Sequence, residues 1–322
     1  MKPVMYHYVR PATDGLPHFP FLRLADFERQ LDDFAANYGF VDRDAFVRWG
    51  QGSSAPDGVL LTFDDGLRDH IEFVLPTLQA RGLFGLFYVN SGPPITGRIL
   101  DVHKVHLALG RLGSQAALAW LETHAPELII TEQEGGGGAS PYAHQTSDAA
   151  TKSLKQLFNW RLTADEREGI LDRLLDHAFA GAPPRWQDFY LDERAMRNLS
   201  SAGMGVGPHS HAHEVASRVS PERQKEEVRL SCDFVELNGG SRQWGYCYPH
   251  GMRSAFTEET ERAVAEAGCP FAFAVEARDI ETPLAEEDRY ALPRHNCNAL
   301  PHGTVSYGRF TERSGQADTE LA

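Results

Sequence analysis

Residues 59–66 read VLLTFDDG, an apolar run followed directly by two adjacent carboxylates and a glycine. A short apolar run predicts a buried strand, so Asp64 and Asp65 would lie where the strand leaves its sheet. Two interpretations fit this charged pair. Asp and Gly are common in turns, and a turn needs no function. Aspartates are rarely buried unless they are paired or bind a metal, so a cation site or a proton-transfer role is the other interpretation.

A helix and a second strand follow this stretch. Apolar residues at 71, 74, 75 and 78 have helical spacing, with Pro76 expected to kink the helix, and residues 83–89 (LFGLFYV) are again apolar. Strand, helix and strand in one short segment are typical of parallel strands joined by a right-handed crossover. The same alternation predicts further strands at 3–9, 204–207, 244–249 and 270–275, and helices at 24–35, 220–237 and 258–267. These segments together predict an α/β fold.

Residues 98–198 interrupt the alternation with helix-like segments. Within them, residues 134–139 (EGGGGA) lack side chains for packing and predict a mobile segment. The polar end of the chain, from about residue 311, predicts a flexible tail. We therefore expect a single catalytic domain over residues 1–322, with a helical insertion or lid at about 98–198.

The composition excludes several classes of protein. The 322 residues are 42% hydrophobic, enough for a large core. Lys and Arg number 31 against 45 Asp and Glu, a formal charge of −14 that disfavours nucleic acid as a partner. We find no secretory signal and no apolar run long enough for a membrane span, so we expect a cytoplasmic protein. The four cysteines are scattered, which predicts reduced thiols.

A histidine cluster in the second half of the chain supplies a partner for the two aspartates. Residues 207–213 read GPHSHAH after a short expected strand. If this segment is helical, His209 and His213 lie one turn apart on the same face. A solvated polar loop is the alternative for the cluster alone. Two imidazoles and a strand-end carboxylate, however, form the ligand set of a metal site that keeps a position open for water.

Three motifs, in this order, resemble the polysaccharide deacetylases of the chitooligosaccharide deacetylase type. They are residues 62–66 (TFDDG), 209–213 (HSHAH) and 248–251 (YPHG), with weaker matches at 5–7 (MYH) and 292–294 (LPR). Residues 100–106 (LDVHKVH) look like members associated with bacterial surface-polysaccharide synthesis. The resemblance implies a distorted (β/α) barrel with its site at the C-terminal ends of the strands.

The resemblance also implies roles for the two aspartates and the two histidines. Asp65, His209 and His213 are expected to bind a divalent metal, most simply Zn²⁺, and Asp64 is expected to act as the general base. The cation would acidify water and polarise the amide carbonyl, while Asp64 accepts a proton. His211 has the wrong spacing to complete the set and is expected to lie outside it.

The third motif departs from the family pattern. Members often have Arg-x-Pro-Tyr-Gly, whereas residues 247–251 read CYPHG, so the arginine beside the base is missing. We expect Arg294 to supply that charge from a neighbouring strand end. His250 can still offer its backbone N–H to an oxyanion. His295 is the expected general acid, with His250 as the competing candidate, and His7 is a candidate for substrate contact.

The implied activity is hydrolysis of an N-acyl amide, acetyl or formyl, on an amino sugar of a bacterial surface glycan such as lipopolysaccharide or on its precursor. Water activated by the metal would be the nucleophile. Two alternatives stay open: a catalytically silent glycan-binding barrel, and a metal-dependent amidase acting on something other than sugar. His103 and Lys104 are either substrate contacts from a lid or exposed charges on a helix. The oligomeric state is not predicted.

Overall fold

The computed structural model describes residues 1–13, 15–129, 147–281 and 288–307. The predicted mobile segment 134–139 and the predicted tail from about 311 lie outside the described residues.

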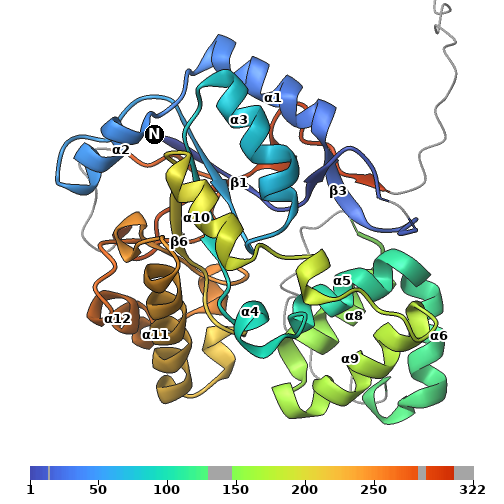
Figure 1. The fold of residues 1–322 in the computed structure, drawn as a ribbon. Helices are drawn as coiled ribbons and strands as arrows, with labels where there is room; N and C mark the ends of the chain where they lie inside the picture. Colours follow the sequence, from blue (N-terminus) through green and yellow to red (C-terminus); the bar gives the residue numbers. More distant parts are fainter. Residues whose placement is uncertain (14, 130–146, 282–287, 308–322) are drawn as a thin grey trace, which may run out of the picture.

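Five parallel strands form the main sheet, in the order β6-β5-β4-β1-β9 (Figure 1). Their bounds are Gly205–Pro208 (β6), Gly85–Val89 (β5), Val59–Phe63 (β4), Lys2–Tyr6 (β1) and His295–Asn296 (β9). Strand β4 is entirely buried, as its apolar sequence predicts. Tyr6 pairs with Phe63, which pairs with Phe87. Because the strands are parallel and in this register, the residues that follow β1, β4 and β6 emerge at the same edge of the sheet.

The strands of the main sheet form part of a barrel wall. A second parallel pair of strands continues this wall: β7 (Tyr246–Cys247) and β8 (Ala272–Phe273). Phe273 forms a parallel bridge with Leu292, and three residues later His295 pairs with Val4 of β1. The segment 292–296 therefore joins β8 to β1 and closes the wall on that side. Between β6 and β7 the described residues form no ladder; the Ser241 N–H donates to the Val206 carbonyl instead. The result is the distorted (β/α) barrel expected from the motifs.

Helices surround the barrel, and short strands lie at its edge. The helices are α1 (Leu24–Asn37), α2 (Arg43–Gly50), α3 (Leu75–Arg81), α10 (Glu193–Ser201), α11 (Pro221–Leu237) and α12 (Glu258–Glu266). The small edge sheet contains β2 (Val9–Arg10), β3 (Pro20–Arg23) and β10 (Ser306–Tyr307). Shorter helical turns are η1 (His70–Val74), α4 (Gly92–Thr96), η3 (Trp186–Asp188), η4 (Ala216–Arg218), η5 (Arg242–Trp244), η6 (Arg253–Ala255) and η8 (Cys297–Ala299). Pro76 lies in the first turn of α3, which continues directly from the π-helical turn η1, so the hydrogen-bonding pattern of the helix changes just before the proline.

The helical insertion forms a lobe beside the barrel, at the lower right of Figure 1. It contains α5 (Asp101–Leu112), α6 (Ser114–His124), α8 (Ala149–Gln156), η2 (Leu157–Arg161) and α9 (Ala164–Ala178). The lobe has its own apolar core, which includes Val105, Leu121, Phe158 and Leu171. A further cluster, with Tyr8, Leu67, Leu100 and Tyr190 among its members, packs the lobe against the barrel. The predicted boundary near residue 198 falls inside α10, whose Met196 and Leu199 belong to the barrel core.

Among the described residues, no helix combines the length and the apolar character needed to cross a membrane.

Candidate active site

Asp65 lies among four histidines at the C-terminal edge of the sheet. Its Oδ1 is 3.3 Å from Nε2 of His209 and 3.3 Å from Nε2 of His213. Its Oδ2 is 3.1 Å from Nε2 of His103 and 3.9 Å from Nε2 of His7. These side chains come from the ends of β1, β4 and β6 and, for His103, from α5 of the helical lobe. The barrel and the lobe thus both contribute to one buried cluster.

The segment around the histidines is a loop, so the condition under which His209 and His213 would lie one helical turn apart is not met. The backbone of this loop has a positive φ of 73° at Ser210 and of 58° at His213. With this backbone, the rings of His209 and His213 lie 5.3 Å apart between centroids. Asp65 (φ 76°) and His250 (φ 60°) also adopt this conformation. Each such residue costs about 1–3 kcal/mol, so the surrounding structure must hold them in place.

Hydrogen bonds from three neighbours hold the histidine loop. The Ser210 Oγ accepts from the His213 N–H at 3.1 Å. The Glu227 carboxylate, on α11, accepts from the N–H groups of His211 and Ala212 at 3.0 and 2.7 Å. Asn90 donates to the His209 carbonyl at 2.5 Å. These hydrogen bonds fix the conformation of the loop against the barrel without a bound ligand.

Asp65, His209 and His213 fit a divalent metal. Their candidate ligand atoms all lie within 4.8 Å of one another, and the side chains are buried. Asp65 Oδ1 is buried and has no hydrogen-bond partner among the described residues, which costs free energy unless a cation lies beside it. His209 Nδ1 lies 2.7 Å from the Cys247 carbonyl and must donate to it, which leaves the Nε2 lone pair facing Asp65. Two imidazole nitrogens and one carboxylate oxygen suit Zn²⁺.

Asp64 forms a bidentate ion pair with Arg294. Arg294 Nη1 and Nη2 each lie 2.8 Å from one Asp64 oxygen, and the guanidinium is completely buried. It also donates to Thr62 and to the Ala274 carbonyl. The expected charge beside Asp64 is therefore present. Because the guanidinium is enclosed by these groups, its contact is with Asp64 and not with a substrate.

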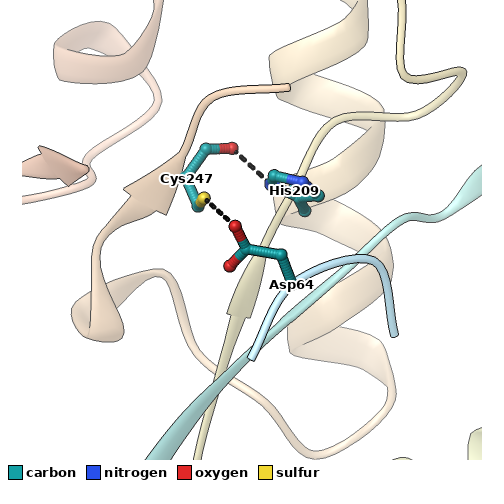
Figure 2. A group of neighbouring side chains, drawn as sticks. All are labelled: Asp64, His209 and Cys247. Carbon is teal, nitrogen blue, oxygen red and sulfur yellow. Dashed lines mark hydrogen bonds between the residues drawn. The ribbon is translucent and has the colours of Figure 1, made fainter. Parts of the chain in front are cut away.

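Cys247 lies where the family pattern has its arginine. Its thiol donates to Asp64 Oδ2 (Figure 2), at a distance of 3.5 Å, and the sulfur lies 3.0 Å from Arg294 Nη2. Asp64, His209 and Cys247 also lie close enough together to hold a metal. Asp64 is already neutralised by Arg294, however, so a cation there would face an adjacent guanidinium. We therefore assign the metal to Asp65 and the two histidines.

Different neighbours lower the pKa values of the two aspartates. Burial would raise the pKa of Asp64, but Arg294, followed by His209, lowers it below its ordinary value. Burial opposes ionisation of Asp65 as well, but His103, His209 and His213 hold its pKa well below the ordinary value. Both aspartates are therefore ionised at neutral pH.

The histidine rings also respond to their surroundings. Burial lowers the pKa of His213, although Asp65 partly opposes this effect, and burial lowers the pKa of His250 well below its ordinary value. For His209, burial is outweighed by Cys247 and the two aspartates, which raise the pKa well above its ordinary value. A cation bound between these rings would displace any such proton.

His250 and His7 lie at the site, whereas His295 does not. The His250 ring is 4.7 Å from the His213 ring and 6.2 Å from Trp160 of the lobe. The side chain of His7 is 39% exposed beside Asp65. His295 Nε2 lies 2.7 Å from Asp279 Oδ1, which also binds Lys2 at the beginning of β1. His295 therefore faces away from the C-terminal edge, and its expected role as general acid lacks a geometric basis.

The sequence pattern did not identify His103 as a partner of Asp65, or Tyr190 as a partner of His103. His103 and Lys104 are buried, so the interpretation of exposed helix charges is wrong. Lys104 pairs with Asp101 and Asp172 inside the lobe. His103 instead points to the site, with Tyr190 on its other side. Helical spacing alone does not reveal which face of α5 meets the barrel.

Comparisons with known proteins agree with this fold. Residues 178–272 match the family model described as polysaccharide deacetylase. No curated protein matches the sequence. Similar solved structures include the deacetylase PplD of Streptococcus pyogenes in complex with acetate (14% identity, TM-score 0.55) and IcaB from Ammonifex degensii (16%, 0.51). A de-N-acetylase from Aggregatibacter actinomycetemcomitans (14%, 0.51) is also similar.

These likenesses extend over nearly the whole chain. The three structures cover 94, 92 and 91% of it, and 95, 90 and 93% of their own chains are covered. The chain therefore has the fold of the polysaccharide deacetylases, and the resemblance expected from its motifs is confirmed.

Proposed function

We propose that this protein is a metal-dependent hydrolase that removes an N-acyl group, acetyl or formyl, from an amino sugar of a bacterial surface glycan or its precursor. The observation that carries the proposal is the pairing of two different aspartates at one strand end. Asp65 faces His209 and His213 with an unbonded oxygen, and the adjacent Asp64 is held by Arg294. A free carboxylate beside a metal-binding carboxylate serves proton transfer, which a simple binding surface does not need.

Asp65, His209 and His213 would hold the cation, most simply Zn²⁺. When bound, the cation would supply Lewis-acid polarisation of the amide carbonyl and acidification of water. Asp64 would take the proton from water as it attacks. Both Asp64 oxygens already accept from Arg294, and Oδ2 also accepts from the Cys247 thiol, but Oδ1 keeps a further lone pair for this proton. The ion pair fixes the orientation of the base and keeps it ionised.

His250 would act on the opposite side of the reacting amide. No acceptor among the described residues takes its backbone N–H, which is therefore free to donate to the developing oxyanion. Its imidazole is our candidate for protonating the leaving amine. Burial lowers the pKa of this ring in the free protein. Negative charge that develops beside the ring would favour its protonated form during the reaction.

The sugar part of the proposal comes from the likenesses. The similar structures are described as a deacetylase in complex with acetate and a de-N-acetylase. A catalytically silent glycan-binding barrel was favoured by the missing arginine of the third motif. Arg294 binds Asp64 in place of the missing arginine, so the departure from the third motif no longer favours a binding protein over an enzyme.

The test uses zinc-loaded protein and small N-acetylated and N-formylated amino sugars, with released acetate or formate as the readout. We expect release from at least one substrate, and Asp64→Asn should abolish it while keeping the bound zinc. Release of no acid from any N-acyl sugar would overturn the sugar assignment. Undiminished turnover by Asp64→Asn would overturn the base assignment.

A further inference from the structure

His103 connects the helical lobe to the proposed metal site. The side chain is completely buried, and it is carried by α5 rather than by a barrel strand. Its Nε2 is 3.1 Å from Asp65 Oδ2, and its Nδ1 is 2.6 Å from the Tyr190 hydroxyl. Tyr190 in turn accepts from the backbone N–H of Leu100 at 3.1 Å. The two nitrogens of one ring are thus both engaged.

The chemistry of these partners fixes where the ring proton lies. An ionised carboxylate can only accept hydrogen bonds, so Nε2 must carry the hydrogen that meets Asp65 Oδ2. In the neutral ring, Nδ1 is then an acceptor and takes the Tyr190 O–H. The hydroxyl keeps its lone pairs for the Leu100 N–H. The donors therefore run in one direction, from Leu100 through Tyr190 and His103 to Asp65.

The two oxygens of Asp65 consequently have different partners. Oδ1 faces His209 and His213, and Oδ2 faces His103. His103 does not belong to the group whose ligand atoms converge on one point. Its hydrogen bond leaves Oδ1 directed at the position of the metal. Outer hydrogen bonds of this kind orient metal ligands and change metal affinity by about 10–100-fold.

We propose that His103, oriented by Tyr190, is a positioning residue that directs Asp65 Oδ1 toward the metal, so that the helical lobe takes part in metal binding. The inference rests on the proposed metal site and deepens it. It assigns to the lobe a role in the site itself, in addition to any role in covering it.

The experiment measures Co²⁺ binding by competition with a chromophoric chelator, together with the visible spectrum of the bound Co²⁺. His103→Leu removes the donor and should lower affinity by about 10–100-fold. His103→Gln keeps an N–H donor at a similar reach and should restore most of the affinity. The spectrum should be unchanged in all the loaded variants, since the ligands themselves are unchanged. Tyr190→Phe should lower affinity in the same direction as His103→Leu.

His106 provides a matched control. It lies one turn further along α5, and its Nδ1 is 3.0 Å from the Tyr8 hydroxyl instead of Tyr190. His106→Leu should bind Co²⁺ like the wild type. If His103→Leu does not fold, Tyr190→Phe carries the test.

Three results would overturn the inference. They are wild-type affinity in both His103→Leu and Tyr190→Phe, failure of Gln to rescue, and an altered Co²⁺ spectrum in His103→Gln, which would make His103 a ligand. A wild-type protein that binds no Co²⁺ would instead remove the proposed metal site, and this inference with it.

Discussion

Replacing Arg294 with Met tests the support around Asp64 directly. The two groups form a fully buried bidentate pair, with both N···O distances at 2.8 Å. At an effective dielectric of about 20, charges about 4 Å apart attract by about 4 kcal/mol. Removing one partner leaves the other charge buried and alone, which typically costs about 3–5 kcal/mol. We expect the free energy of unfolding of Arg294→Met to fall by about that amount at pH 7.

The same variant should change the pH dependence. Arg294 is the largest of the contributions that lower the pKa of Asp64 against its burial. Without it, burial raises that pKa, so the ionised base needs a higher pH. The acidic limb of kcat/KM should therefore move to higher pH. The stability deficit should be largest at neutral pH and should shrink as the pH falls below the raised pKa, where Asp64 is neutral in the folded protein.

Urea unfolding at several pH values and a pH–rate profile check both expectations. Asp64→Asn in the Arg294→Met background removes the second charge and should recover much of the stability, without activity. Arg294→Lys keeps a positive charge but not the two parallel hydrogen bonds. Its free energy of unfolding should therefore lie between those of Arg294→Met and the wild type. The reasoning is refuted if Arg294→Met unfolds like the wild type at pH 7, or if its acidic limb stays in place.

Three further predictions concern the metal, the turn and the lobe. Chelation should abolish activity and lower the melting temperature, and added Zn²⁺ should restore both; at a free concentration of about 100 Kd the ion adds about 2.7 kcal/mol. Gly66→Ala should lower the free energy of unfolding in urea by more than Gly82→Ala does. Both glycines have a positive φ, but only at Gly66 would a Cβ meet Val89, at 2.8 Å. Trp160→Ala should raise KM more than it lowers kcat. The buried indole N–H lies beside His250 without a partner among the described residues, so we expect it to donate to a sugar hydroxyl in the complex. An unchanged KM would contradict this.

The sequence predicted the parts of the site that depend on strand ends. Asp64 and Asp65 follow an apolar strand, and parallel register alone carries them to the edge where His209 emerges. The likeness to a family suggested Arg294 from its place near the last strand, and the ion pair is present. The positions of the two aspartates and of Arg294 depend on local sequence pattern and on strand order, which can be predicted from a sequence.

The sequence failed where geometry depends on backbone detail or on tertiary packing. The sequence left open whether residues 209–213 form a helical turn or a loop, and the positive φ values at Ser210 and His213 could not be predicted from these residue types. His295 directly follows Arg294, but it binds Asp279. His103 was ambiguous because its environment is made by a barrel distant from it in the chain. Cys232 and Cys269, scattered in sequence, lie with their sulfur atoms 3.7 Å apart.

The left-handed backbone at Asp65 has a consequence for how the enzyme could move. With φ at 76°, the chain turns between two neighbouring residues, so one carboxylate meets Arg294 and the next meets the histidines. Asp64 and Asp65 are joined by one peptide unit, about 3.8 Å between Cα atoms. A movement of the lobe would break the His103 hydrogen bond to Asp65 Oδ2, but it would leave this backbone link between the two aspartates unchanged.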